Sequence, residues 1–207
     1  MKKIGFIGIG LMGLPMAKNI LKSGYKLIAF NRSPNKADLL KEFGAEIAKS
    51  LGELVNNSDV IITMLTDDKA VDEVMNNKNF VENLKSGKIL IDMSSVKPIT
   101  AKKHANSLKL KDINYLDAPV SGGTIGAEEA TLAIMIGGDQ NVFNEVKDLL
   151  VDALEALDDQ WDVLYPWVGR AAPEDFARDD GHVAALDAER LLDVLLELLH
   201  RLLRVRP

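Results

Sequence analysis

The chain has no cysteine in its 207 residues. This absence excludes disulfide bonds, thiolate metal sites and cysteine nucleophiles, and it favours a reducing compartment, for which we expect the cytoplasm. We predict no metal site. No apolar run approaches the roughly 20 residues that a membrane-spanning helix needs. Residues 1–3 lead into a strand pattern instead of a signal-peptide core, so we expect a soluble protein with no membrane partner.

Several residue types disappear from the last part of the chain. Residues 151–207 contain no lysine, isoleucine, asparagine, serine, threonine or methionine, although all six are common upstream. Basic and acidic residues number 19 and 18 in residues 1–150, but 6 and 13 in residues 151–207. The net charge of −6 comes from the second part, and it argues against general nucleic-acid binding.

A composition shift this abrupt predicts two parts with different histories. It indicates a fusion, an engineered replacement or a designed segment, and the alternative is a natural acidic, leucine-rich helical domain. Residues 186–205 place leucine and valine over most of a helix surface and polar groups in a narrow stripe. Because so wide an apolar face needs burial on more than one side, we expect this helix to form a homo-oligomer or to dock on residues 1–150.

Short apolar runs alternate with helix-period segments through residues 1–150, which is typical of βαβ units. We predict an α/β fold, a Rossmann-type doubly wound parallel sheet, followed by a short α-helical segment in residues 151–207. Gly24 and Gly44 are expected to end helices, Ser50 to cap one and Pro98 to begin another. The predicted strands are 3–8, 26–30, 45–48, 60–65, 89–93, 114–117 and 132–136; the predicted helices are 11–23, 34–43, 50–56, 68–76, 98–108 and 139–150.

The first predicted strand runs directly into a glycine-rich motif, Gly8-x-Gly10-Leu11-Met12-Gly13, and a helical pattern follows. A dinucleotide pyrophosphate needs a tight turn at the first glycine, a bare backbone at the second and close helix-to-strand packing at the third. Free N–H groups and the helix dipole then face the anion. The motif predicts a nucleotide cofactor site, and the alternative is a turn that binds nothing.

The end of the second predicted strand favours one cofactor. An NAD site usually has Asp or Glu there to bond the ribose 2′-hydroxyl, but this chain has Asn31, Arg32 and Ser33, with Lys36 one turn later. The guanidinium suits a phosphate, and the lysine adds a second positive charge. We predict NADP(H) over NAD(H). The alternative for Arg32 and Lys36 is an ordinary solvated turn.

Ligands of doubly wound sheets collect where strands end, so the loops after later strands are further candidates. Met64 and Leu65 end the fourth predicted strand, and Ser94 and Ser95 follow the fifth. We predict that these residues contact the ribose and nicotinamide. A serine that only caps the helix at Pro98 is the alternative.

A third loop contains Ser121, Gly122 and Gly123, after the strand at 114–117. Their backbone N–H groups and the serine hydroxyl form a nest suited to a carboxylate, so we predict a small carboxylate substrate here. A plain glycine-rich turn is the alternative.

Together these motifs resemble the 3-hydroxyisobutyrate, or β-hydroxyacid, dehydrogenase family, especially its NADPH-dependent glyoxylate and succinic semialdehyde reductase branch. The resemblance covers about residues 1–150. It implies hydride transfer between C4 of the nicotinamide and a short 3-hydroxy acid or semialdehyde, whose carboxylate the Ser121–Gly123 loop holds. The motifs are Gly8-Ile9-Gly10-Leu11-Met12-Gly13-x-Pro15-Met16-Ala17, Asn31-Arg32-Ser33, Asp92-Met93-Ser94-Ser95 and Asp117-Ala118-Pro119-Val120-Ser121-Gly122-Gly123.

The family's catalytic lysine and substrate-supporting asparagine have no match in this sequence. The resemblance implies a Gly-x-Gly-x-x-x-Lys-x-x-x-Asn helix further along, but the last lysine is Lys147 and the last asparagine is Asn144. Arg170 falls near the expected distance without the surrounding pattern, and its pKa is too high for proton transfer. We therefore assign no catalytic residue.

Three interpretations stay open at this point. The chain is an NADP(H)-dependent hydroxyacid dehydrogenase with an altered C-terminal part, a truncated or chimeric cofactor-binding domain with impaired catalysis, or a non-catalytic scaffold. In the last case the helical tail mediates dimerisation or partner binding.

Overall fold

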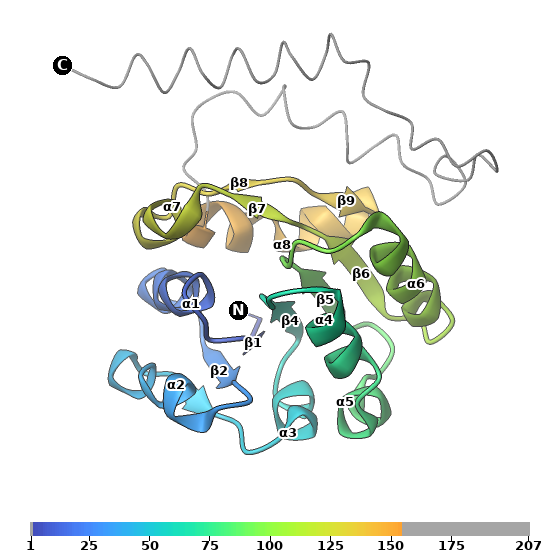
Figure 1. The fold of residues 1–207 in the computed structure, drawn as a ribbon, viewed down its shortest axis with the longest axis horizontal. Coiled ribbons are helices and arrows are strands. Elements are labelled where there is room, and N and C mark those ends of the chain that lie inside the picture. The colour runs from blue at the N-terminus through green and yellow to red at the C-terminus, as the bar shows by residue number, and fades with distance from the viewer. Residues whose placement is uncertain (1, 155–207) are drawn as a thin grey trace, which may run out of the picture. The chain divides into compact units, whose positions relative to one another are not determined.

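The computed structural model describes residues 2–154 (Figure 1). The predicted helix at 186–205 and Arg170 lie outside the described residues. The elements are β1 (Ile4–Ile7), α1 (Gly13–Lys22), β2 (Leu27–Phe30), α2 (Pro34–Asp38), a 3₁₀ turn (Lys41–Phe43), β3 (Glu46–Ile47), α3 (Leu51–Asn56), β4 (Val60–Thr63), α4 (Asp68–Met75), α5 (Lys78–Asn83), β5 (Ile89–Asp92), α6 (Pro98–Lys109), β6 (Asn114–Asp117), β7 (Val120–Ser121), α7 (Gly123–Glu129), β8 (Ala133–Ile134), β9 (Gly137–Gly138) and α8 (Gln140–Leu154).

The main sheet has the strand order β3-β2-β1-β4-β5-β6-β9. Neighbours from β3 to β6 pair in parallel, and β9 closes the edge antiparallel to β6. The chain winds outward from β1 in one direction and from β4 in the other, so the order reverses between these two central strands. The predicted Rossmann-type α/β fold is confirmed.

Helices cover both faces of this sheet, and a separate apolar cluster fills each face. Side chains of α1, α2 and α8 pack in one cluster, and those of α3, α4, α5 and α6 in the other. Figure 1 shows α7 and the paired strands β7 and β8 on the side of α1 and α8. Because both faces are covered, β1, β4 and β5 are buried along their whole length, as expected for a parallel sheet.

Local signals in the sequence placed several helix ends correctly. Gly24 and Gly44 have φ values of +86° and +91°, which favour glycine, and each follows a helical segment. Ser50 Oγ accepts a hydrogen bond from the Glu53 N–H at 3.1 Å, as an N-cap does. Pro98 occupies the first position of α6.

The helix predicted at 34–43 is split. α2 ends at Asp38, and a 3₁₀ turn follows at Lys41–Phe43. Ala37 in α2 and Leu40 just before the 3₁₀ turn are both fully buried in the same apolar cluster. Helix α5 was not predicted from the sequence, although Asn77 caps it and Phe80 anchors it in the core.

The strand predicted at 132–136 does not join the parallel sheet. β8 pairs antiparallel with β7 in a two-stranded sheet, and the chain then returns as β9. After β6 the chain forms β7 outside the main sheet, and after α7 it runs back along β7 as β8. The prediction was right about strand structure here and wrong about its pairing.

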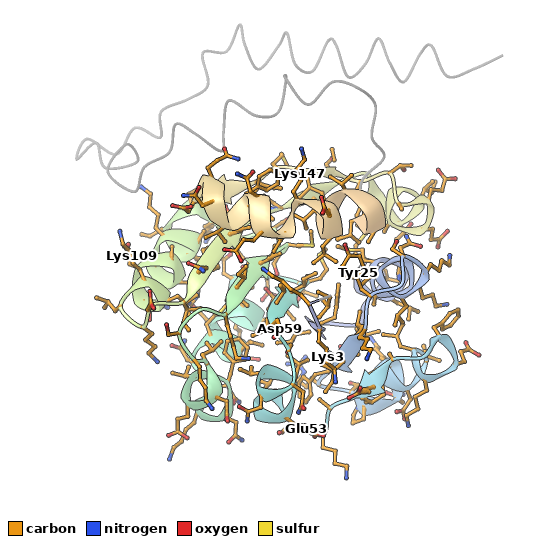
Figure 2. All side chains as sticks on the ribbon, turned by 180° about the vertical axis from the view of Figure 1, so that it is seen from behind. Lys3, Tyr25, Glu53, Asp59, Lys109 and Lys147 are labelled. Atoms are coloured by element: carbon orange, nitrogen blue, oxygen red, sulfur yellow. The ribbon has the colours of Figure 1, made fainter. Side chains whose placement is uncertain are left out.

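The edge of the sheet where β1 and β4 begin is closed by polar bonds. The Lys3 backbone N–H donates to Asp59 Oδ2 at 2.8 Å, and Lys3 Nζ donates to Glu46 Oε2 at 2.8 Å; Lys3 and Asp59 are labelled in Figure 2. Among the helices of residues 2–154, none has the length and hydropathy needed to cross a membrane. α8 continues through residue 150 to Leu154, so this helix spans the composition change.

Candidate functional site

The three glycines of the motif have three different surroundings. Gly8 has a φ of +103°, and a Cβ atom there would lie 2.2 Å from the carbonyl oxygen of Met64 at the end of β4. A Cβ on Gly13 would lie 2.0 Å from the carbonyl oxygen of Gly8. Both distances are far inside van der Waals contact, so only glycine fits the turn and the start of α1. A Cβ on Gly10, in contrast, meets nothing within 4 Å.

The open space at Gly10 adjoins backbone donors without partners. α1 begins at Gly13 with no side-chain cap, and the Gly10 carbonyl accepts the first helical bond, from Leu14 at 3.0 Å. Among the described residues nothing accepts a hydrogen bond from the N–H groups of Gly10, Leu11 or Met12. Leu11 is 84% exposed. These amides and the helix dipole suit an anion that approaches the bare backbone at Gly10.

Asn31, at the end of β2, holds this turn in place. Its Oδ1 accepts a hydrogen bond from the Ile9 N–H at 2.9 Å, and its Nδ2 donates to the Ser33 carbonyl at 3.0 Å. The side chain therefore links the glycine-rich turn to the loop that carries Arg32. Asn31 is predicted from the sequence to contact the cofactor, and in the structure it also makes these two structural bonds.

Arg32, Ser33 and Lys36 are all exposed beside that loop. Arg32 Nη1 lies 3.5 Å from Glu73 Oε2 of α4, and the arginine side chain is 89% exposed. No carboxylate follows β2 directly, as the sequence indicated, but α4 supplies one to the same place. No local pattern in the sequence indicates this pair, because its members are 41 residues apart.

The loops after β4 and β5 are joined by Ser94. Its Oγ accepts a hydrogen bond from the Leu65 N–H at 2.9 Å, and the residue is fully buried. Ser95 beside it is exposed, whereas Met64 is half-buried. The N-cap residue of α6 is Lys97, so neither serine caps that helix. A role for these residues in cofactor binding stays a prediction.

Beneath Ser94 lies a buried carboxyl group, Asp92, the last residue of β5. Its Oδ1 accepts hydrogen bonds from Thr63 Oγ1 at 2.8 Å and from the Ser94 N–H at 3.1 Å. Its Oδ2 and the hydroxyl of Tyr115 are buried and have no hydrogen-bond partner among the described residues. Burial raises the pKa of Asp92, although the bonds from Ser94 and Thr63 act against the rise. In the sequence, Asp92 is recognisable only as part of the Asp92-Met93-Ser94-Ser95 motif.

Asp117 stands opposite Asp92 in the paired strands β5 and β6. Burial, and secondly the charge of Asp92, raise the pKa of Asp117 to about 6. The charge of Asp92 thus opposes the ionisation of Asp117 at the edge of the sheet where the loops meet.

The predicted substrate loop follows β6. Ser121, Gly122 and Gly123 are exposed, and the two glycines have φ values of +137° and +64°. Gly122 is the N-cap of α7 and has no side-chain bond. A Cβ on Gly123 would meet nothing within 4 Å, so this backbone is also open to a ligand. Carboxylate binding there stays a prediction.

The fold therefore brings the predicted cofactor residues to one edge of the sheet, where β1, β2, β4 and β5 end. The central residues Gly8 and Met64 lie where the strand order reverses, which is the usual ligand position in doubly wound sheets.

Comparison with known proteins agrees with this geometry. The sequence profile described as the NAD binding domain of 6-phosphogluconate dehydrogenase matches residues 3–157. The chain belongs to the 3-hydroxyisobutyrate and 6-phosphogluconate dehydrogenase family. It contains an NAD(P)-binding domain of the hydroxyacid dehydrogenase type, as the resemblance implied.

Individual members of the family match the same part of the chain. A 2-hydroxy-3-oxopropionate reductase of Escherichia coli is 43% identical over 148 residues, which are 71% of this chain and 50% of the relative. A solved 3-hydroxyisobutyrate dehydrogenase of Mycobacterium tuberculosis with L-serine has a TM-score of 0.69 and 30% identity, over 75% of this chain and 52% of that one. A second solved structure, Psf3 with NADP+ and 2-OPP, has a TM-score of 0.71 and 28% identity, over 74% of this chain and 54% of that one. The chain spans about half the length of the curated relatives it matches.

The Asp117→Asn variant is expected to unfold at higher urea concentration than the parent at pH 8, and at the same concentration at pH 4. An unfolded aspartate has a pKa of about 3.9, so the folded parent, with its raised pKa, binds more protons between pH 4 and 6 and loses stability as pH rises through that range. Asparagine does not ionise and avoids the loss, which is at most about 3 kcal/mol because one pKa unit corresponds to about 1.4 kcal/mol.

Asp148→Asn on the surface of α8 is the matched control, because it removes an exposed carboxylate. An equal shift of the urea midpoint at both pH values in Asp117→Asn would show that the pKa of Asp117 is not raised in the folded protein.

Proposed function

We propose that residues 1–150 form the NADP(H)-binding domain of a β-hydroxyacid dehydrogenase, with residues 151–207 as a second part. The observation that carries the proposal is the open backbone at Gly10, flanked by unbonded amides and by an exposed arginine at the end of β2. The cofactor, when bound, supplies hydride exchange at C4 of its nicotinamide ring. The chain's own residues bind it, orient it and shape the substrate site.

The proposed division of roles follows the strand ends. The amides of Gly10, Leu11 and Met12 hold the pyrophosphate, and Arg32 with Ser33 and Lys36 holds the 2′-phosphate. The loops that begin at Met64 and Ser94 border the ribose and nicotinamide, and the hydrogen bonds of Asp92 hold these two loops together. The solved relative with bound NADP+ supports the choice of cofactor by similarity.

The proposed reaction is hydride transfer between the nicotinamide and a short semialdehyde or hydroxy acid. The amides of the Ser121–Gly123 loop hold the carboxylate of that substrate. The 2-hydroxy-3-oxopropionate reductase and 3-hydroxyisobutyrate dehydrogenase among the relatives support this substrate class. No residue of the chain is assigned to proton transfer, so we propose a domain with impaired catalysis.

NADPH is expected to bind more tightly than NADH, and Arg32→Ala to remove the difference. A charge-assisted contact to the 2′-phosphate contributes about 1.5–3 kcal/mol, so the variant should lose about 10- to 150-fold in NADPH affinity and little in NADH affinity. Titration of protein fluorescence with each cofactor measures both dissociation constants.

Lys85→Ala is the control for loss of one exposed positive charge, because Lys85 lies in the turn before β5 begins. Equal affinities for the two cofactors in the parent, or an unchanged preference in Arg32→Ala, would refute the role of Arg32.

Turnover is expected to be slow. The reduction of glyoxylate or succinic semialdehyde is measured through the oxidation of NADPH. Its rate should be about 10²–10⁴-fold lower than in a relative that carries the family's catalytic lysine, because positioned proton transfer usually contributes a factor of this size. Fast turnover that disappears in Lys97→Ala or Arg170→Ala would show that one of these residues moves the proton.

A further inference from the structure

The acidic residues of α4 and its N-cap have different partners. Asp67 caps the helix by accepting from the Ala70 N–H at 2.8 Å. Asp68 accepts from the Lys97 N–H at 3.0 Å, and Asp72 from Lys103 Nζ and His104 Nε2, both at 2.8 Å. The bonds of Asp68 and Asp72 join α4 to α6 and its N-cap residue. Glu73 is the exception, because its bond is to Arg32 beyond the end of β2.

The Arg32–Glu73 pair contributes little to folding. The two side chains are 89% and 51% exposed, and their closest atoms are 3.5 Å apart. Solvent screens a pair of this kind, and holding two long side chains together costs entropy. Its main consequence is local, because it places a negative charge beside the guanidinium proposed to hold the 2′-phosphate.

The pair changes what the missing carboxylate after β2 implies. In an NAD site, Asp or Glu at the end of β2 bonds the ribose 2′-hydroxyl and repels a 2′-phosphate. Here α4 brings the carboxylate to Arg32 from a different element. A phosphate at Arg32 must compete with Glu73 for the guanidinium and lie close to a like charge, whereas a neutral 2′-hydroxyl meets no repulsion and can donate to the carboxylate.

We propose that Glu73 is a selectivity residue. It lowers the preference for NADPH that Arg32 creates, so that NADH can compete with NADPH for the site. This inference rests on the proposed cofactor site. Arg32 attracts the 2′-phosphate, Glu73 opposes it, and the balance of the two sets the ratio of the dissociation constants. The effect requires no contact between Glu73 and the reacting atoms.

The test is the Glu73→Gln variant, titrated with NADPH and with NADH by protein fluorescence at low salt. Glutamine keeps the size of the side chain and removes its charge. We expect the NADPH dissociation constant to fall about three- to tenfold, the order of magnitude for removal of a like charge at a solvated site, and the NADH constant to stay or rise. The gain should shrink in 0.5 M NaCl, because salt screens exposed charges.

Glu82→Gln is the matched control. Glu82 is an exposed glutamate on α5 in an ion pair with Lys78, and its loss should leave both dissociation constants unchanged. Melting temperatures should be equal in all three proteins. An NADPH-to-NADH preference in Glu73→Gln that equals or falls below the parent's overturns the inference. Failure of the parent to bind either cofactor would instead refute the proposed function.

Discussion

The close approach of α1 to β1 is the constraint on which the rest of the site depends. A Cβ on Gly13 would lie 2.0 Å from the Gly8 carbonyl, so the helix can begin this near to the strand only without a side chain. The consequence is that unbonded amides lie directly beyond the carboxyl end of β1. Because β2 and β4 flank β1, the loops that follow them reach the same place, and Asn31 fixes one of these loops to the turn.

A buried polar network supports the other side of the site. Asp92 bonds Thr63 at the end of β4 and the backbone of Ser94, which in turn bonds Leu65. The loops after β4 and β5 are therefore held to each other by side chains inside the sheet. A carboxyl group in this position costs solvation, and its pKa rises, as does that of Asp117 opposite. The burial of these carboxyl groups therefore lowers the stability of the fold, whereas the hydrogen bonds of Asp92 and Ser94 hold the loops in place at the ligand edge.

Features that depend on neighbouring residues could be predicted from the sequence, and features that depend on distant pairing could not. The separate roles of Gly8, Gly10 and Gly13 follow from their spacing, and the cap at Ser50 follows from its own turn. The predicted pairing of the strand at 132–136 was wrong, because apolar composition indicates a strand but does not indicate which strand lies next to it. The sequence likewise gave no sign that Glu73 would meet Arg32, because that contact exists only after β2 and α4 are packed in the same fold.

The most direct test of the account is NADPH titration of a Gly10→Val variant, with its melting temperature measured alongside. A Cβ at Gly10 meets no protein atom within 4 Å, so the variant should fold as the parent does. The branched side chain would nevertheless occupy the space proposed for the pyrophosphate. We expect a folded protein without measurable affinity for NADPH or NADH. A folded variant that binds NADPH as tightly as the parent would contradict it.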